Sequence, residues 1–467
     1  MIWIKETRSS LVLYGGMEKI DTLRRFGLFD LSVPRYTSYP PANHFEPDTG
    51  RKWQASWLRA IPEGEEVSVY VHIPFCRRLC WFCACRTQGT STLNPVESYV
   101  TTLLSEIQMA HAEMPATARM GRLHLGGGTP TLLSVPLMRK LITTLFETFE
   151  RSEDFEFSVE VDPTDATDEV LTTLMELGMT RASIGVQDFA QDVQDAIGRQ
   201  QSVEQTRHVV DLLREQGIGG INFDVLYGLP HQTLAGFGET LNQSLAMRPD
   251  RLAIYGYAHV PWVSKRQKLI PESALPDPET RFQLAEQANR VFRLAGYRPL
   301  GIDHFALPHD GLAKAAEAGQ LKRNFQGYTD DTARYLIGFG ASAISRYPDG
   351  YVQNAVATSA YHQRIKTGVL PGDRGYHMSA DDHVKARFVE DIMCSFGFDA
   401  HAVAADFPEA AEAIFATAIA IEEQFGEVLV RAGGTLTLKP DYHPLARIMA
   451  KQVDRFQTTT SCHSQAI

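Results

Sequence analysis

Short β-branched and apolar runs alternate with amphipathic segments from about residue 66 onward. The runs predict strands at residues 68–73, 122–125, 156–161, 181–186, 221–227, 251–257 and 298–302. Apolar residues at three-to-four spacing predict helices at residues 96–113, 135–148, 168–177, 203–216 and 279–294. Such alternation is typical of repeated βα units, so we expect a parallel sheet of six or seven repeats.

Parallel strands joined by right-handed crossovers form either an open doubly wound sheet or a whole or partial barrel, and the pattern alone does not choose between them. Residues 20–65 are rich in Pro, Tyr and Trp and predict an extended arm. After about residue 360 the alternation of predicted strands and helices ends. Helical segments at 381–396 and 410–425 precede a hairpin whose Gly433-Gly434 pair suits a tight turn.

The chain therefore divides into three predicted parts. Residues 1–50 form an N-terminal extension and arm, residues 51–360 an α/β body, and residues 361–467 a mainly helical C-terminal domain with a small hairpin. Helices beside a hairpin can also form a winged helix. The mixed charge of this segment favours a packing or lid role over DNA binding.

The composition is that of an ordinary globular protein: 467 residues, 44% hydrophobic and 22% charged. A net charge of -11 excludes the broad positive field that non-specific nucleic-acid binding needs, so any anionic ligand must meet local cations. No apolar run is long enough to predict a membrane span. Lys5, Glu6 and Arg8 make the start unlike a signal peptide, and Met17 is a second possible start.

Four of the six cysteines are clustered, which points to metal or redox chemistry in a reducing compartment, here the cytoplasm. Cys76, Cys80 and Cys83 form a C-x3-C-x2-C motif directly after the first predicted strand. Three thiolates on a four-iron cubane leave the fourth iron open to a non-protein ligand. A zinc site completed by Cys85 or His72, and unrelated buried cysteines, are the alternatives.

Only one residue separates Cys85 from Cys83, so the backbone would be strained if both thiolates bound irons of the same cluster. We therefore interpret Cys85 as a non-ligand. Cys394 lies on an apolar helical face and is expected to be a core residue. Cys462, in a polar tail, is given no specific role.

Other candidate ligand-binding residues follow the next strands. Gly126, Gly127 and Gly128 follow the second strand, where the backbone can approach a ligand and present its N–H groups to a carboxylate. Glu160, Gln187 and Asp224 lie at or just beyond the ends of the third, fourth and fifth strands. A barrel would direct them toward one mouth. For the histidines at 72, 124 and 304 we expect structural roles.

The cysteine triplet, with an aromatic residue before the third cysteine, resembles the radical S-adenosylmethionine (radical SAM) superfamily. PRYTSYP at 34–40, HLGGGTPT at 124–131, GVQDF at 185–189, DVLYGLP at 224–230 and NFQGYT at 324–329 resemble the oxygen-independent coproporphyrinogen III oxidase family. Trp81 and Ala84 stand where that family often has Tyr and Gly. The fourth cysteine is similar to the oxidase rather than to its haem-chaperone relatives.

This resemblance implies a partial, TIM-like (β/α) barrel with an N-terminal arm and a mainly helical C-terminal domain. It implies a [4Fe-4S] cluster on Cys76, Cys80 and Cys83, with SAM on the open iron. It also implies which residues contact SAM. Tyr70, Gly127, Glu160 and Ile344 match contacts of the cluster-bound SAM, and Phe82, Gly128, Thr129, Gln187, Arg199, Asp224 and Ala258 match contacts of a second SAM.

The implied reaction is oxidative decarboxylation of two propionates of coproporphyrinogen III to vinyl groups, giving protoporphyrinogen IX in haem biosynthesis. A 5′-deoxyadenosyl radical would abstract hydrogen, and two SAM molecules would be used per turnover. A low-potential donor such as a flavodoxin or ferredoxin would supply electrons, and a monomer is expected. The rival functions are a haem-binding chaperone or another radical SAM paralogue that acts on a tetrapyrrole, and a zinc-stabilised binding protein.

The substrate carries four carboxylates, so an acidic protein needs cations near the mouth to bind it. Arg35, in the PRYTSYP arm, is the candidate for a substrate carboxylate. Arg77 and Arg78, beside the cysteines, fit either a binding role or a solvated loop.

Overall fold

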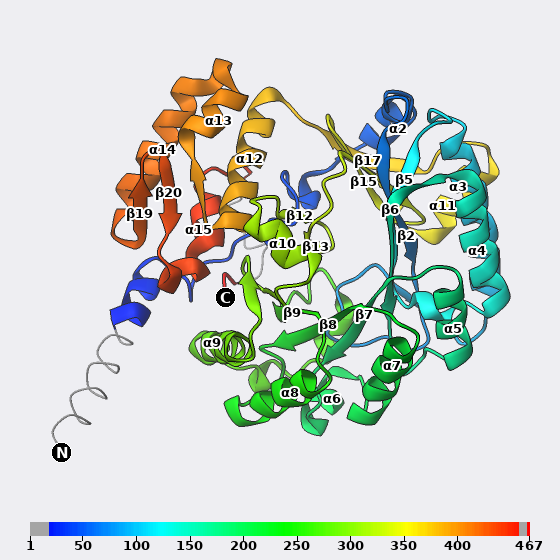
Figure 1. Cartoon of the computed structure of the whole chain (residues 1–467), viewed down its shortest axis with the longest axis horizontal. Coiled ribbons are helices and arrows are strands. Elements are labelled where there is room, and N and C mark those ends of the chain that lie inside the picture. Colours follow the sequence, from blue (N-terminus) through cyan, green and yellow to red (C-terminus); the bar gives the residue numbers. More distant parts are fainter. Residues whose placement is uncertain (1–17, 457–464) are drawn as a thin grey trace.

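The computed structural model describes residues 18–456 and 465–467. The alternative start at Met17 and the tail residue Cys462 lie outside these ranges. The largest element is a 13-stranded sheet with the order β1-β17-β16-β15-β14-β2-β5-β6-β7-β8-β9-β11-β10. It curls into a partial barrel with helices on its outer side (Figure 1).

The strands from β14 to β9 in that order run parallel to their neighbours. They are β2 (Glu66–Ile73), β5 (Arg119–Gly127), β6 (Glu150–Val161), β7 (Arg181–Gln187), β8 (Gly220–Tyr227), β9 (Arg251–Gly256) and β14 (Tyr335–Phe339). Apolar side chains of β2 are buried almost throughout, as expected of a parallel strand covered on both faces. Six of these strands match the predicted ones, and β14 was not predicted.

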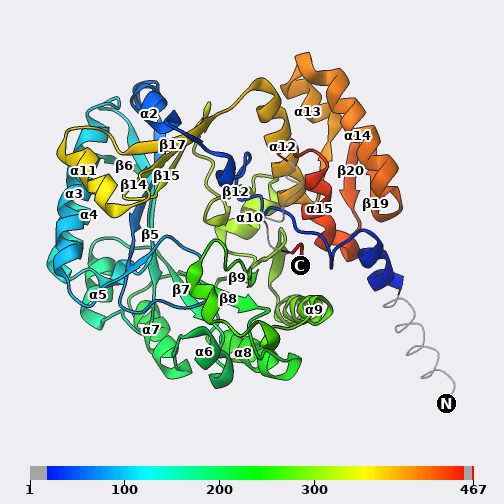
Figure 2. The ribbon, with the colours of Figure 1, turned by 180° about the vertical axis from the view of Figure 1, so that it is seen from behind.

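Helices connect the parallel strands and cover the outside of the barrel (Figure 2). They are α3 (Asn94–His111), α4 (Val135–Thr148), α5 (Asp168–Glu176), α6 (Gln191–Ile197), α7 (Val203–Glu215), α8 (Leu234–Ala246) and α9 (Pro278–Leu294). Local sequence fixes several starts: Ser202 and Gln205 form a capping box at α7, and Asp277 caps α9. The five predicted helices are all present.

The edges of the sheet are antiparallel, and here two predictions are wrong. Residues 298–302 do not add a parallel strand: β10 (Arg298–Leu300) pairs antiparallel with β11 (His304–Ala306), which pairs antiparallel with β9. The turn between them is too short for a parallel crossover. Within the predicted extended arm, α2 (Thr49–Arg59) is a helix that packs on the far edge.

That far edge comprises β1 (Glu46–Pro47), β15 (Ile344–Tyr347), β16 (Gly350–Asn354) and β17 (Gly372–His377). It extends beyond residue 361, where the C-terminal domain was predicted to begin. Smaller elements on the barrel side are β3 (Phe75–Cys76), β4 (Gln88–Gly89), β12 (Lys322–Asn324), β13 (Gly327–Thr329), α10 (Gly311–Glu317) and α11 (Thr358–Lys366).

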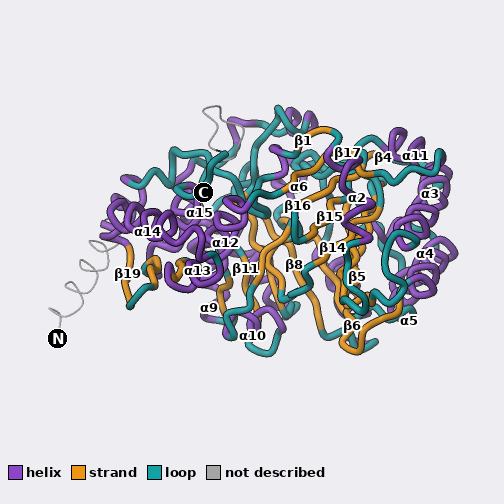
Figure 3. Tube along the Cα trace, turned by 90° about the horizontal axis from the view of Figure 1, so that it is seen from above, coloured by secondary structure: helices purple, strands orange, loops and turns teal. Residues whose placement is uncertain are grey.

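The C-terminal part packs beside the barrel, as the views from the front and from above agree (Figure 3). Its elements are α12 (Ala380–Ser395), α13 (Ala400–Asp406), α14 (Ala411–Phe425), α15 (Ala446–Lys451), β18 (Gly397–Asp399), β19 (Leu429–Ala432) and β20 (Thr435–Leu438). β19 and β20 form the predicted hairpin, with Gly433 at φ 62° in its turn. β18 adds a third strand that was not predicted.

Two large hydrophobic cores stabilise the part of the chain that the structure describes. The larger fills the space between the parallel strands and their helices. The second joins the C-terminal helices to the N-terminal arm, because Leu23, Leu28, Phe29 and Val33 are buried in it. Cys394, predicted to be a core residue, is half-buried and packs against a small third cluster. Short 3-10 helices complete the fold: η1 (Ala42–His44), η2 (Pro130–Leu132), η3 (Lys265–Leu269), η4 (Glu272–Ala274), η5 (Pro408–Ala410), η6 (Gly426–Val428) and η7 (Pro440–Leu445).

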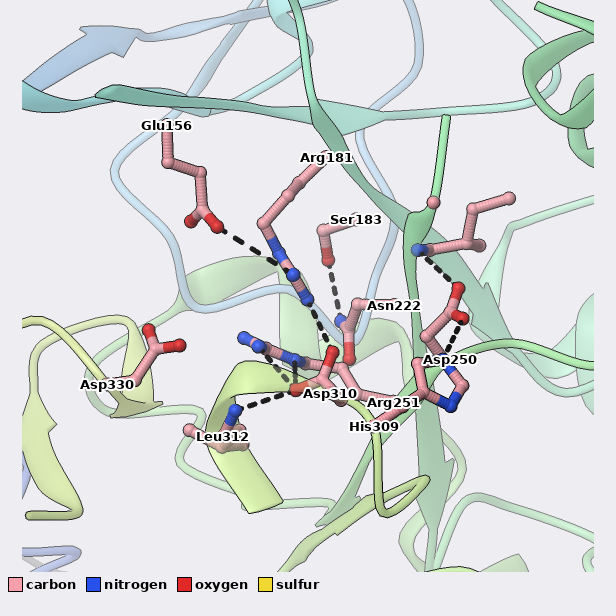
Figure 4. A network of polar contacts seen from close by, with 12 residues as sticks. Glu156, Arg181, Ser183, Asn222, Asp250, Arg251, His309, Asp310, Leu312 and Asp330 are labelled. Atoms are coloured by element: carbon pink, nitrogen blue, oxygen red, sulfur yellow. Dashed lines mark hydrogen bonds and ion pairs between the residues drawn. The ribbon is translucent and has the colours of Figure 1, made fainter. Parts of the chain in front are cut away.

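A network of ion pairs holds the amino ends of several parallel strands (Figure 4). Arg181, at the start of β7, and Arg251, at the start of β9, both bind the Asp310 carboxylate, at 3.0 and 2.6 Å. Glu156 lies 3.8 Å from Arg181. Each buried arginine here therefore has a carboxylate partner. The opposite ends of the strands are left for the chemistry.

Among the described residues, none lies in a helix that is both long and apolar enough to cross a membrane.

Candidate functional site at the carboxyl ends of the strands

The cysteine loop follows β2 and is tied back onto the barrel. Its two ends form a small parallel ladder, in which the Gln88 N–H donates to Pro74 O and the Thr90 N–H to Cys76 O. On the far side, the Trp81 N–H donates to Ile197 O at 2.9 Å. The loop is therefore held at the mouth, where barrels of this type carry their chemistry.

Helix η3 covers the outside of the same loop. Ser264 Oγ donates to Cys83 O at 2.9 Å, and Gln267 Nε2 donates to both Phe82 O and Ala258 O. The Arg266 guanidinium donates to Cys85 O and to Thr87. Sequence reasoning missed these loop residues, because nothing in a polar run after β9 indicates which strand end it will cover.

The cysteines differ in exposure. Cys80 is buried, Cys76 and Cys83 are half-buried, and Cys85 is exposed. Burial raises the pKa of Cys76 to about 11, although the Thr129 hydroxyl acts against this. The Cys85 N–H donates to Cys83 Sγ at 3.4 Å, so these two residues are adjacent in space as well as in sequence.

Arg199 binds the cysteine loop directly. Its Nη1 lies 3.7 Å from Cys80 Sγ and 2.9 Å from the Asp162 carboxylate, and its Nη2 donates to Gly185 O. A cation at this point offsets the negative charge of thiolates gathered on one loop. Asp162, directly after β6, was not singled out from the sequence, although its position after a strand was a usable signal.

The three cysteines fit a cubane cluster in their chemistry. Each thiolate of a cubane binds a different iron, so the sulfurs surround the cluster rather than meet at one point. Within the described ranges, no three His, Cys, Asp or Glu side chains are grouped so that they could hold a single metal ion.

The glycines at the end of β5 and directly after it pack tightly against β2 and the residues that follow β2. Gly127 has φ 112°, and a Cβ there would lie 2.6 Å from the His72 ring. Its N–H donates to Glu160 Oε2 at 3.0 Å, and the next two N–H groups donate to Ile73 O and Phe75 O. These amides thus have partners within the protein, whereas the sequence predicted that they face a ligand carboxylate.

The residues that match the cluster-bound SAM lie together. A Cβ at Gly126 would touch both the Glu160 carboxylate and the Tyr70 ring. Tyr70 lies opposite Gly338 of β14, and Ile344 backbone atoms lie against that glycine. Burial by itself would raise the pKa of Glu160, but His124 and the Gly127 N–H hold it below its usual value.

Two of the residues that match a second SAM lie on strands, Gln187 on β7 and Asp224 on β8. The others lie in loops: Phe82 in the cysteine loop, Gly128 and Thr129 after β5, Arg199 after α6 and Ala258 after β9. Gly185 joins three of them: it pairs with Asp224, lies beside Gln187 Nε2, and accepts a hydrogen bond from Arg199. Gln187 sits at a bulge with φ 66°, a conformation that costs free energy and is common at functional sites. Burial, together with the Glu160 charge, raises the pKa of Asp224.

The three histidines have structural hydrogen bonds, as predicted. His72 lies between Tyr70 Oη and Arg86 O, and burial lowers its pKa. His304 bonds to the Asp303 carboxylate at 2.6 Å. His124 bonds to Ser158 Oγ and lies 3.4 Å from Glu160, so its structural role includes positioning a site residue.

The candidate cations lie in different places. Arg35 donates to Gly256 O at the end of β9. Arg78 donates to Thr164 Oγ1 at 3.0 Å, whereas Arg77 is exposed and 4.0 Å from Asp165. Of these three arginines, Arg35 is therefore the one that lies at the barrel mouth beside β9.

Comparison with known proteins gives a consistent result. Residues 70–243 match the Radical SAM superfamily. The chain is 48% identical to an oxygen-independent coproporphyrinogen III oxidase of Paracoccus denitrificans, over 97% of this chain and 100% of that protein. It is also 48% identical to "coproporphyrinogen III oxidase, anaerobic 1" of Cereibacter sphaeroides, over 96% and 100%.

A solved structure agrees. The fold matches coproporphyrinogen III oxidase (HemN) from Escherichia coli, described as a radical SAM enzyme, with a TM-score of 0.86 and 32% identity. The match covers 91% of this chain and 100% of that one.

Proposed function

The chain belongs to the oxygen-independent coproporphyrinogen III oxidase family of the radical SAM superfamily, and from that premise we propose its reaction. The enzyme converts two propionate side chains of coproporphyrinogen III into vinyl groups, giving protoporphyrinogen IX in haem biosynthesis. The observation that carries this assignment is identity of 48% over nearly the full length of named oxidases. The haem-chaperone and zinc-protein alternatives are not favoured.

The cofactors are a [4Fe-4S] cluster and SAM, which when bound supply the one-electron chemistry that removes a hydrogen atom from a propionate. In each conversion the propionate loses that hydrogen atom, one electron to an acceptor, and carbon dioxide. Two conversions use two SAM molecules. The protein contributes binding, orientation and exclusion of water.

We propose that Cys76, Cys80 and Cys83 hold the cluster, while Cys85 does not. Their common loop and the Arg199 contact with Cys80 Sγ support this assignment. For the cluster-bound SAM we propose contacts with Tyr70, Gly127, Glu160 and Ile344, and for a second SAM contacts with Phe82, Gly128, Thr129, Gln187, Arg199, Asp224 and Ala258. The support is that Tyr70, Gly127 and Glu160 lie at neighbouring strand ends, and that Gln187, Arg199 and Asp224 meet around Gly185.

We further propose that a low-potential donor such as a flavodoxin or ferredoxin reduces the cluster, since SAM cleavage consumes an electron. The clustered cysteines suit the reducing cytoplasm as the compartment. We also propose that the protein acts as a monomer, since the proposed site needs no residue from a second copy of the chain.

The direct test is an anaerobic assay of the reconstituted protein with coproporphyrinogen III, SAM and a chemical reductant. We expect protoporphyrinogen IX, carbon dioxide and 5′-deoxyadenosine, with about two SAM cleaved per product. The Cys80→Ser variant should give none of these. Tight haem binding without vinyl product from the intact enzyme would instead support the chaperone.

A further inference from the structure

Four arginines from four separate elements meet at the mouth beside β8 and β9. They are Arg35 in the arm, Arg281 in α9, Arg323 in β12 and Arg447 in α15. Arg35 donates to Gly256 O, and Arg281 Nη2 donates to the next carbonyl, Tyr257 O. Arg323 and Arg447 reach the same place from the other side, through the carbonyls of residues 33–36.

These guanidinium groups are bound mostly to neutral backbone carbonyls, and Arg281 Nη2 also donates to the O atom of Ile467, the last residue of the sequence, at 2.8 Å. Within the described ranges, the only side-chain carboxylate within 4.0 Å of any of them is Asp303, at 3.8 Å from Arg323 Nη1. The buried arginines of the ion-pair network at the other end of the strands, Arg181 and Arg251, both have Asp310 (Figure 4). Burying a charge without an opposite charge costs free energy of folding. The difference between the arginines at the two ends of the strands therefore needs an explanation.

Two of the four also have unused donors. Arg323 Nη1 and Arg281 Nε are buried nitrogens without a hydrogen-bond partner. The Arg323 side chain is only 4% exposed, and its guanidinium lies over the Tyr328 ring at 4.4 Å, which fixes its plane. A buried, oriented guanidinium with a free N–H is suited to a carboxylate oxygen.

Arg447 differs from Arg281 and Arg323 because each of its three guanidinium nitrogens has a hydrogen-bond partner. It donates to Val33 O, Pro34 O, Gln465 O and Ala466 O, so it fastens the arm and the tail residues to α15. Burial, followed by the charge of Arg35, lowers its pKa to about 9. Arg447 therefore positions the arm, and hence Arg35, while adding to the positive field.

We propose that Arg35, Arg281 and Arg323 bind carboxylates of the substrate, at the place where the arm meets the ends of β8 and β9. This rests on the proposed function, which supplies a substrate with four carboxylates. It extends the sequence-based candidate, Arg35, to two residues whose sequence neighbourhoods gave no such signal. Two proposed SAM contacts belong to the same part of the fold: Asp224 lies on β8, and Ala258 follows the end of β9.

The test is equilibrium binding of coproporphyrin III, the stable oxidised form of the ring system, to the reconstituted enzyme under argon. Its uncharged tetramethyl ester serves as the ligand control. We expect the intact enzyme to bind the acid far better than the ester, with affinity falling as salt rises. Arg281→Gln and Arg323→Gln should each weaken binding of the acid about tenfold or more, and should raise KM for coproporphyrinogen III more than they lower kcat.

Arg293→Gln is the matched control, since Arg293 is exposed on the same helix as Arg281. It should bind like the intact enzyme. Arg323→Lys keeps the positive charge but loses the planar guanidinium that can donate two parallel hydrogen bonds. Its affinity for the acid should lie between that of the intact enzyme and that of Arg323→Gln. Folding of each variant is checked by its thermal transition and by SAM cleavage without substrate.

Unchanged binding of the acid by folded Arg281→Gln and Arg323→Gln would overturn the proposal and leave these arginines as purely structural clamps. Equal binding of acid and ester would overturn it as well. Arginine-dependent binding without vinyl product would instead count against the proposed reaction, so the two failures are distinguishable.

Discussion

At the scale of single residues, the site depends on a few side chains that join strands rather than on one catalytic group. Arg199 connects Cys80, Asp162 and Gly185, which come from the cysteine loop and the ends of β6 and β7. Gln267 similarly joins the loop to the segment after β9. Radical chemistry needs no tuned acid or base, so positioning is what this chain contributes.

Gly127 gives a residue-scale prediction. A Cβ at this position meets the His72 ring at 2.6 Å, and φ of 112° is unfavourable for alanine. Gly127→Ala should therefore lower the free energy of unfolding by roughly 1–3 kcal/mol for the backbone, with a further loss from the clash. Chemical denaturation measures this.

Gly178→Ala is its control, because Gly178 has φ 94° but open space around its Cβ position. It should lose only the backbone contribution. If Gly127→Ala proves no less stable than Gly178→Ala, the close packing of the glycine against His72 is wrong.

At the scale of elements, the loop after β14 is held by a buried carboxylate. Glu106 of α3 is 1% exposed and accepts hydrogen bonds from Gly340 N, Tyr361 Oη and Asn354 Nδ2. Burial raises its pKa from 4.5 to about 7 despite these donors. The loop it holds leads to Ile344, one of the proposed SAM contacts.

This shift predicts a pH dependence of stability. The folded state binds the Glu106 proton more tightly than the unfolded state, so the stabilisation is complete below pH 4.5 and is lost as the pH rises to about 7. The loss is on the order of 3 kcal/mol for a shift of this size. Denaturant unfolding of the intact protein and Glu106→Gln at pH 5 and pH 7.5 measures it.

The free energy of unfolding of the intact protein should fall over this range by more than that of Glu106→Gln, whose side chain does not titrate. A parallel pH response of the two proteins would show that Glu106 is not the group responsible.

Helices and strands were predictable from the sequence where the hydrophobic residues recur at regular spacing. The six strands from β2 to β9 and their helices follow regular βα spacing, and the cysteine loop falls after the first of them as expected. The far edge was not predictable, because β15 to β17 mix polar residues and glycines and no helical rhythm precedes β14. Arg281 and Arg323 were missed because only the fold brings α9 and β12 to the arm.

At the scale of the whole molecule, the N-terminal arm joins the two halves. Its apolar side chains are buried in the core of the C-terminal helices, and Tyr36 Oη donates to the Asp454 carboxylate at 2.9 Å. The same segment carries Arg35 to the barrel mouth. The C-terminal part thus fixes an arm that reaches the site, which supports a packing role for it.

The central claim is that three cysteines hold a cubane whose fourth iron is free to bind SAM. It is tested most directly by electron paramagnetic resonance of the reduced, anaerobically reconstituted protein before and after SAM is added. We predict a [4Fe-4S] signal that changes on adding SAM, both in the intact protein and in Cys85→Ser, and that is absent in Cys80→Ser. A signal that SAM leaves unchanged, or stoichiometric zinc with no cluster signal, would contradict the account.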